Sequence, residues 1–179
     1  MNNREVVLYI AMSLDGYIAD SDGGISFLQQ VEKDGEDYGY KEFSSSTDVV
    51  ILGRKTWETV LSFNLPEVYS GKQVFVISKK KEGREGNVVY YGGDIPTLIR
   101  KLKSETGLNI HIDGGAEVVY TMLKDKLIDR IIVSVIPVLL GDGIRLFGSS
   151  FPVHRLKLKQ CLTFSTGLVQ LHYETEAES

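Results

Sequence analysis

Apolar and polar residues along the chain form two kinds of segment. Short runs such as residues 49–52 (VVIL) are hydrophobic throughout, which is typical of parallel strands buried on both faces. Amphipathic stretches of helical period separate these runs, and this order predicts an α/β fold. We predict strands at residues 6–12, 49–52, 73–78, 88–90, 109–112 and 129–137, and helices at 35–45, 55–61, 96–104 and 117–127.

The end of the chain has a different pattern. Two strand-like runs, residues 156–164 and 168–174, flank a short turn that contains Gly167. This arrangement predicts an antiparallel hairpin at the end of the sheet. No linker or internal repeat interrupts the 179 residues, so we expect one domain over residues 1–175 and a polar tail at 176–179.

Composition and charge exclude several classes of protein. A net charge of -4 offers no basic face for general nucleic-acid binding. No apolar run approaches the ~20 residues of a membrane span, and we expect a cytoplasmic protein. The single cysteine, Cys161, excludes internal disulfides, and we predict a buried, inert thiol. His111 and Asp113 alternate on one strand face, but two ligands do not make a metal site, so no metal is predicted.

Asp113-Gly114-Gly115-Ala116 lies between a predicted strand and a predicted helix. Two glycines let the backbone approach a ligand closely, and a helix N-terminus attracts an anion such as a phosphate. The same pattern also forms ordinary tight turns between strand and helix. The pattern therefore makes a nucleotide the natural ligand without requiring one.

Other predicted strands end in residues of similar chemistry. In an open α/β sheet, ligands bind at the carboxyl ends of the strands. Cationic and hydroxyl side chains at these ends suit phosphate groups, although each one alone is also a common helix cap or surface residue. Their joint placement after successive strands favours a phosphate-bearing ligand. The residues are Gly53, Arg54, Lys55 and Thr56 after the second strand, and Ser78 and Lys79 after the third.

Longer motifs carry a family resemblance. VVILGRKTWE followed by QVFVISKK closely resembles the second and third strands of dihydrofolate reductases. AMSLDGYIA and IDGGAEVVYTMLKDKLIDRIIVSVIPVLLGDGIRLF resemble the reductase domain of the bifunctional riboflavin-biosynthesis deaminase/reductase. The resemblance covers nearly the whole chain. It implies a dihydrofolate reductase-like, three-layer α/β/α fold whose mixed, mostly parallel sheet holds NADPH across its strand ends.

The resemblance also implies roles for single residues. The backbone around the glycine pair would hold the cofactor pyrophosphate, and the residues after the second strand would contact phosphates. Ser78 and Lys79 would lie near the 2′-phosphate, which favours NADPH over NADH. The implied cofactor residues are Ala11 and Ile18 beside the nicotinamide, Gly53, Arg54, Lys55, Thr56, Ser78 and Lys79, and Gly114, Gly115 and Ala116.

Three aspartates are candidates for proton transfer. Asp15, after the first strand, is first of all a turn residue, and catalysis is the alternative. Asp113 is acidic where riboflavin-pathway reductases tend to have glutamate. Asp37 stands sixteen residues before Gly53, the spacing at which dihydrofolate reductases carry the carboxylate that binds the substrate.

We place Asp37 on a helix, where it would bind an amino-heterocycle and help to protonate the reduced ring. Glu36 or Glu42 would replace it if an insertion shifts the match.

The chain departs from both families on the substrate side. Tyr9 stands where riboflavin-pathway reductases typically carry a lysine, and residues 55–58 lack the aspartate of that family. The loop at residues 20–27 lacks the Trp-x-x-Leu-Pro segment of dihydrofolate reductases. The departures leave the cofactor residues intact.

Three functions follow from these observations. We expect an NADPH-dependent reductase of the riboflavin-biosynthesis type, which transfers hydride to a heterocyclic amine. The alternatives are a dihydrofolate reductase and a non-catalytic nucleotide-binding module that forms oligomers.

The sequence also bears on assembly. Residues 131–140 (IIVSVIPVLL) are strongly apolar and pass through Pro137, which predicts a sheet edge or a bend. Either the terminal hairpin or a second subunit would cover such an edge. Because riboflavin-pathway reductases are commonly oligomeric, we expect a homodimer.

Overall fold

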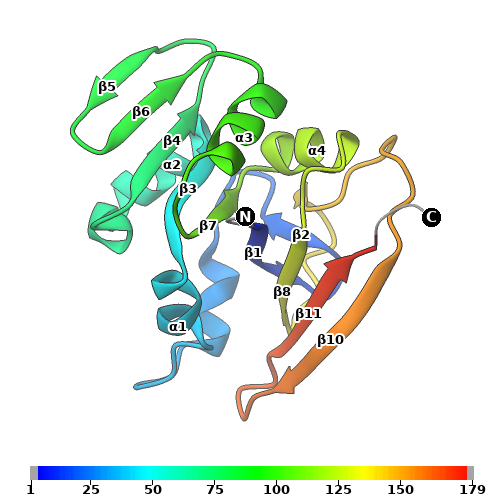
Figure 1. The fold of residues 1–179 in the computed structure, drawn as a ribbon. Coiled ribbons are helices and arrows are strands. Elements are labelled where there is room, and N and C mark those ends of the chain that lie inside the picture. The colour runs from blue at the N-terminus through cyan, green and yellow to red at the C-terminus, as the bar shows by residue number, and fades with distance from the viewer. Residues whose placement is uncertain (1–3, 177–179) are drawn as a thin grey trace.

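A nine-stranded sheet runs through the middle of the molecule, with helices on both faces (Figure 1). The computed structural model describes residues 4–176. The strands of the large sheet are β1 (Val6–Ser13), β3 (Thr47–Gly53), β4 (Gln73–Ile77), β5 (Gly83–Glu85), β6 (Val88–Tyr91), β7 (Asn109–Gly114), β8 (Arg130–Ile136), β10 (Leu156–Thr163) and β11 (Val169–Thr175). The helices are α1 (Tyr40–Ser45), α2 (Arg54–Ser62), α3 (Ile95–Ser104) and α4 (Ala116–Lys124), with 3-10 helices η1 (Ser26–Val31) and η2 (Pro66–Tyr69). Two short strands, β2 (Tyr17–Ala19) and β9 (Ile144–Arg145), pair separately.

The sheet is mixed and mostly parallel. Its order is β10-β11-β8-β1-β7-β3-β4-β6-β5. Neighbours from β8 to β6 run parallel, whereas β5, β11 and β10 are antiparallel to their partners. The predicted α/β fold with a C-terminal antiparallel hairpin is therefore confirmed. The carboxyl ends of the parallel strands meet along one edge, which is where such sheets bind ligands.

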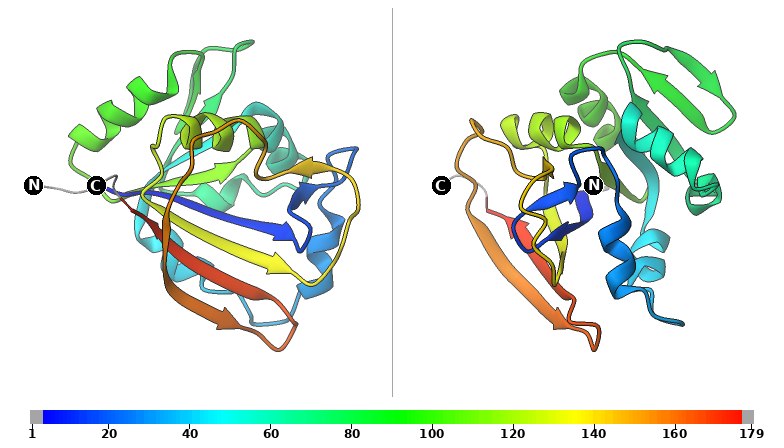
Figure 2. Two further views of the ribbon diagram at one scale, coloured as in Figure 1. Left: turned by 90° about the vertical axis from the view of Figure 1, so that its right-hand side faces the viewer. Right: turned by 180° about the vertical axis from the view of Figure 1, so that it is seen from behind.

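The central strands of the sheet are hydrophobic and are buried on both faces. Leu8 on β1 and Leu52 on β3 are both fully buried, as their uniformly apolar surroundings predict. One face packs against α3 and α4 in the largest core cluster, which includes Leu8 and Ile112. The opposite face packs against Trp57 of α2. Figure 2 shows the helices on the two sides of the sheet.

The helix at residues 35–45 was predicted too long, because only Tyr40–Ser45 forms α1. Gly35 and Gly39 have φ angles of 78° and 79°, in the left-handed region that interrupts a helix. A buried lysine secures the end of the short helix instead. Lys72 Nζ donates hydrogen bonds to the carbonyl of Ser44 and, at 2.7 Å, to that of Thr47.

Two predictions for this part of the chain had different outcomes. Of the alternatives for residues 131–140, the bend and the covering hairpin are confirmed: β1 and β11 flank β8, so it is not an edge, and the chain bends at Pro137, directly after the strand's last residue. The prediction that Cys161 is buried was wrong: the residue is exposed, because it lies on β10, one of the two edge strands of the sheet.

Two observations concern the C-terminal tail and the length of the helices. Of the predicted polar tail, residues 177–179 lie outside the described residues. Within residues 4–176, no helix is long and apolar enough to cross a membrane.

Candidate functional site

Two glycines bring two helix N-termini together at the ends of the neighbouring strands β3 and β7. Gly53 precedes α2 and Gly115 precedes α4, and no side chain in residues 4–176 caps either helix. A Cβ atom at Gly115 would lie 3.5 Å from Gly53 Cα and 3.2 Å from Thr56 Oγ1. Gly115 has φ of 75° and Gly114 has φ of 127°, which favour glycine. Uncapped N–H groups and two dipole ends make this junction, which we call the glycine cradle, an anion site.

The side chains predicted to contact phosphates lie at the glycine cradle. Thr56 Oγ1 faces Gly115, and Lys55 is exposed beside it. The Arg54 guanidinium pairs with the Glu58 carboxylate one helical turn away. Both partners of this pair are substantially exposed, so the pair contributes little stability, and the guanidinium is available to an anion. Ala116 begins α4 directly at the cradle.

A cavity of about 310 Å³ lies across the ends of β4 and β6. Ser78 and Lys79, the predicted 2′-phosphate residues, line it, and Thr121 of α4, the helix that begins at the glycine cradle, lines it too. Ser78 Oγ accepts hydrogen bonds from the Lys80 and Lys81 N–H groups, both at 3.1 Å. Lys79 is the one cation among the described residues that line this cavity. The others are Ile77, Tyr91, Gly92, Gly93, Asp94, Ile95, Pro96 and Asp125.

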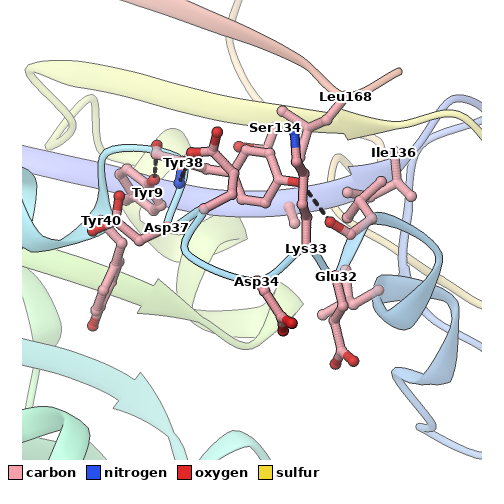
Figure 3. Close-up of a pocket in the computed structure, with 14 residues that line it drawn as sticks. Tyr9, Glu32, Lys33, Asp34, Asp37, Tyr38, Tyr40, Ser134, Ile136 and Leu168 are labelled. Carbon is pink, nitrogen blue, oxygen red and sulfur yellow. Dashed lines mark hydrogen bonds between the residues drawn. The ribbon is translucent and has the colours of Figure 1, made fainter. Parts of the chain in front are cut away.

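A larger cavity of about 480 Å³ lies on the sheet face under η1 and α1, and Figure 3 shows its residues. Ala11, the predicted nicotinamide neighbour, and Asp37, the predicted substrate-binding carboxylate, both line it. Ile18 does not; it packs against the largest core cluster. We call this space the substrate-side cavity, and its lining residues are Tyr9, Ala11, Leu28, Val31, Glu32, Lys33, Asp34, Glu36, Asp37, Tyr38, Tyr40, Ser134, Ile136 and Leu168.

A buried amide organises the floor of the substrate-side cavity. Gln170 is only 2% exposed. Its Nε2 donates to Ser134 Oγ at 3.0 Å, to the Tyr38 carbonyl at 3.1 Å and to Tyr9 Oη at 3.2 Å. Burial lowers the pKa of His172, so the ring is neutral, and its Nε2 lies 2.7 Å from Gln170 Oε1. A hydrogen bond from His172 to Oε1 fixes which end of the amide faces the cavity.

Tyr38, in the wall of the cavity, has an unusual backbone conformation. Its φ of 54° is uncommon for a residue with a side chain. The hydroxyl donates to the Val31 carbonyl and lies 3.0 Å from Thr166 Oγ1 on the C-terminal hairpin. Strain of this kind persists where the surroundings over-determine the backbone, so the loop between η1 and α1 has a set position.

Asp113 lies between two buried polar groups at the end of β7. The Tyr69 hydroxyl donates to Asp113 Oδ2, and burial together with this carboxylate raises the pKa of Tyr69. His111 Nε2 is 3.5 Å from Asp113 Oδ1 and has no hydrogen-bond partner in the described part of the chain. Burial lowers the pKa of His111, so the ring is neutral. Asp113 is thereby held immediately before the glycine cradle.

Asp15 has the turn role that its motif favours. Its carboxylate accepts hydrogen bonds from Ser13 Oγ at 2.6 Å, from Gly141 N at 2.7 Å and from Leu140 N at 3.1 Å. The bond from Ser13 contributes most to lowering the pKa of Asp15 to about 2. The carboxylate is therefore ionised at neutral pH and joins the loops that follow β1 and β8; it is a poor proton donor.

Asp37 lies at the cavity but not on a helix. Its carboxylate accepts hydrogen bonds from Gly39 N at 3.0 Å and Lys41 N at 3.1 Å, and these bonds lower its pKa. Glu36 also lines the cavity, and its Oε1 accepts from Tyr38 N at 2.9 Å. Glu42 is not among the lining residues.

Sequence analysis missed several residues that build the site. Ser134 and Gln170 form the cavity floor, and Tyr69 and His111 contact Asp113. A usable signal existed for Ser134, since it is the one polar residue within the apolar run of β8. Tyr69 gave no such signal, because its contact with Asp113 spans 44 positions of the chain.

The fold is an α/β fold of the dihydrofolate reductase-like class, with a candidate anion site at the ends of β3 and β7. The model of the RibD C-terminal domain family matches residues 4–170, so the chain belongs to that family. The Uncharacterized protein YwjB of Bacillus subtilis (strain 168) is 41% identical over 171 residues, which span 95% of this chain and 97% of that protein.

Solved structures agree with this assignment. A Shewanella sp. PV-4 protein named for riboflavin biosynthesis superposes with a TM-score of 0.87 and 31% identity, over 97% of this chain and 99% of that one. The Thermotoga maritima diaminohydroxyphosphoribosylaminopyrimidine deaminase/5-amino-6-(5-phosphoribosylamino)uracil reductase superposes with a TM-score of 0.70 and 17% identity. The two proteins share the fold. The superposition includes 97% of this chain but only 57% of the longer enzyme.

Because the pKa of Asp15 is depressed, we predict that this residue stabilises the fold less in acid than at neutral pH. Because the folded-state pKa, about 2, lies below the ordinary value of 3.8, the carboxylate stabilises the fold above pH 3.8 and loses this effect as the pH falls towards 2. Asp15→Asn should therefore unfold at lower urea concentration than wild type at neutral pH, and the gap should narrow in acid. Asp22→Asn, an exposed control, should have the same urea midpoint as wild type at both pH values. A difference in midpoint between Asp15→Asn and wild type that stays constant with pH would contradict the prediction.

Proposed function

We propose that this protein is an NADPH-dependent reductase that acts on a heterocyclic amine. The observation that carries the proposal is the glycine cradle, which lies between a cavity lined by Lys79 and a second cavity with a polar floor. A dinucleotide has the matching parts: a pyrophosphate in the middle, an adenosine phosphate at one end and a nicotinamide at the other. Bound NADPH would supply the hydride.

Each part of the site has a proposed task. The N–H groups at Gly115 and Ala116, with Thr56, would bind the pyrophosphate. Ser78 and Lys79 would bind the 2′-phosphate. Their cavity also contains Asp94, but that carboxylate caps α3 by accepting from Thr97 N at 2.9 Å, so it does not compete for the same ligand atoms.

The cavity beside Ala11 would receive the substrate. Its volume of about 480 Å³ suits a small heterocycle. Tyr9 and Tyr40 line it, and Tyr40 lies edge-on to Tyr9 with centroids 5.7 Å apart. Ser134 and Tyr9 would offer hydroxyl groups to polar ring atoms of the substrate. Of the three aspartates, Asp37 is the one that lines this cavity, so we propose it as the carboxylate nearest the substrate, and Asp113 as a group that supports the cradle.

Cofactor oxidation tests the proposed function directly. NADPH absorbance is followed with the protein and either 5-amino-6-(5-phosphoribosylamino)uracil, its dephosphorylated nucleoside, or dihydrofolate. Oxidation with an aminouracil and not with dihydrofolate is expected. Turnover of dihydrofolate alone would instead make the protein a dihydrofolate reductase. NADPH binding without any turnover would favour the non-catalytic module.

The choice of cofactor depends on Lys79. Removing a charge-assisted contact to the 2′-phosphate costs about 1.5–3 kcal/mol, so Lys79→Ala should weaken NADPH binding roughly tenfold or more. NADH binding, which lacks that contact, should be unchanged. Lys80→Ala is a matched control, since Lys80 is equally exposed but does not line the cavity. Calorimetry that finds equal NADPH affinity for all three proteins would refute this role for Lys79.

We also propose that the protein is a homodimer that forms through the outer end of the sheet. Leu156 and Leu158 on β10 are 40% and 52% exposed. Their register partners on β11 are Thr175 and Tyr173, and Cys161 pairs with Leu171. Cross-strand partners share a face, so these side chains form an apolar strip. No helix in residues 4–176 lies over β10 in Figures 1 and 2, and a two-fold axis would cover the strip with its own copy.

Sedimentation tests the assembly. At micromolar concentration, wild type should sediment at about twice the 20.0 kDa chain mass. Leu158→Asp should sediment as a monomer, because a charge would be buried without a partner. Leu108→Asp is the control, since Leu108 is 51% exposed elsewhere on the surface. A wild-type protein that stays monomeric throughout this range would end the proposal.

A further inference from the structure

The rim of the substrate-side cavity is strongly acidic. Four carboxylates and a single ammonium belong to the described residues that line it, and all five come from the short loop between η1 and α1. Figure 3 shows the Glu32 and Asp34 carboxylates turned away from Tyr9 and Ser134, towards the outside. Their charge therefore acts at the entrance rather than as a ligand on the floor. The residues are Glu32, Asp34, Glu36 and Asp37, with Lys33 as the ammonium.

The one cation on the rim is already engaged. Lys33 Nζ donates a 2.7 Å hydrogen bond to Ser165 Oγ on the turn of the C-terminal hairpin. Two of the four carboxylates are held by their own loop, since Asp37 accepts two backbone N–H bonds and Glu36 accepts one. The negative field at the entrance is thus a built feature of the loop.

The floor carries no compensating positive charge. Tyr9, at the position where riboflavin-pathway reductases typically carry a lysine, offers a hydroxyl that donates to the Tyr38 carbonyl at 3.0 Å. Gln170 supplies a neutral amide, and His172 behind it is neutral because burial lowers its pKa. Among the described floor residues, only neutral donors and acceptors face the cavity. A phosphate group, with about two negative charges, would meet four carboxylates and one ammonium among the described lining residues.

We infer that the substrate of this site is a neutral or cationic amino-heterocycle that carries no phosphate. The inference rests on the proposed reductase function, and it separates this chain from enzymes that reduce a phosphoribosylated aminouracil. Electron-rich tyrosine faces at Tyr9 and Tyr40, together with the acidic rim, favour a planar ring that is neutral or positively charged. A phosphorylated ring is disfavoured because its negative charge is repelled by the exposed carboxylates at the entrance.

A pair of substrates that differ by one phosphate tests the inference. The full chain is saturated with NADPH, and kcat/KM is measured with the ribosylaminouracil nucleoside and with its 5′-phosphate. The nucleoside should be preferred by about tenfold or more, which corresponds to ~1.4 kcal/mol. Raising the ionic strength should shrink this preference, because salt screens exposed charges.

Variants show whether the rim causes the preference. The double variant Glu32→Gln/Asp34→Asn removes two rim charges whose carboxylates point outwards, and it should narrow the preference for the nucleoside. The control Glu105→Gln/Glu176→Gln removes two exposed carboxylates that do not line the cavity, and it should leave the preference as in wild type. If both double variants reduce the preference for the nucleoside equally, the cause is the overall charge of the protein, and the proposed role of the rim is overturned.

The remaining outcomes separate this inference from the reductase proposal. Equal or faster turnover of the phosphate would overturn the inference and leave the reductase intact. If neither compound is reduced, the proposed function fails. Calorimetry on the NADP⁺-loaded protein then still decides the charge question, since tighter binding of the nucleoside supports a phosphate-free ligand and tighter binding of the phosphate excludes one.

Discussion

The close approach of Gly53 and Gly115 is the constraint on which the rest of the site depends. A side chain at Gly115 would lie 3.2 Å from Thr56 Oγ1 and 3.5 Å from Gly53 Cα. The requirement for glycine is at position 115, where φ is 75° and a Cβ atom would crowd Thr56, whereas a Cβ atom at Gly53 would make only ordinary contacts, the nearest at 3.6 Å to Val118. The close approach of the two glycines needs β3 and β7 to be parallel neighbours, which their register provides. It also turns two dipole ends towards the same space, where an anion stabilises both.

A second constraint acts on the other side of the strand ends. Burying the Gln170 amide is favourable only when its donors and acceptor are bonded, since a lost partner costs about 1–3 kcal/mol. The three acceptors of Nε2 come from β1, β8 and the loop before α1. One side chain therefore ties the cavity floor to the loop that carries the acidic rim. The shape of the cavity and the charge at its entrance are set by the same network.

The three aspartates show how environment divides one residue type among different roles. A hydrogen bond from the Ser13 hydroxyl, together with backbone N–H groups, holds the pKa of Asp15 low, and backbone N–H groups do the same for Asp37, so both act as anions in loops at neutral pH. Asp113 has a tyrosine hydroxyl on one oxygen and a neutral, buried histidine near the other. Only Asp113 adjoins the glycine cradle. The three roles differ because the hydrogen-bond partners of the three carboxylates differ. The spacing of the aspartates along the chain does not encode these partners.

The sequence by itself determined the α/β class, most strands, the start of helix α3 and the place of the candidate phosphate-binding residues at strand ends, because each depends on local patterns. Uniformly apolar runs specify buried parallel strands, and Asp94 accepts from Thr97 N at the start of α3 as its position implies. Only the tertiary structure decided the length of α1, the interior place of β8, the exposure of Cys161 and the contacts of Tyr69, His111 and Gln170. These features depend on which distant segments become neighbours: β11 covers β8, and the hydroxyl of Tyr69 meets Asp113 across 44 positions. Propensity and period describe a few neighbouring residues, whereas burial and hydrogen-bond partners are properties of the folded whole.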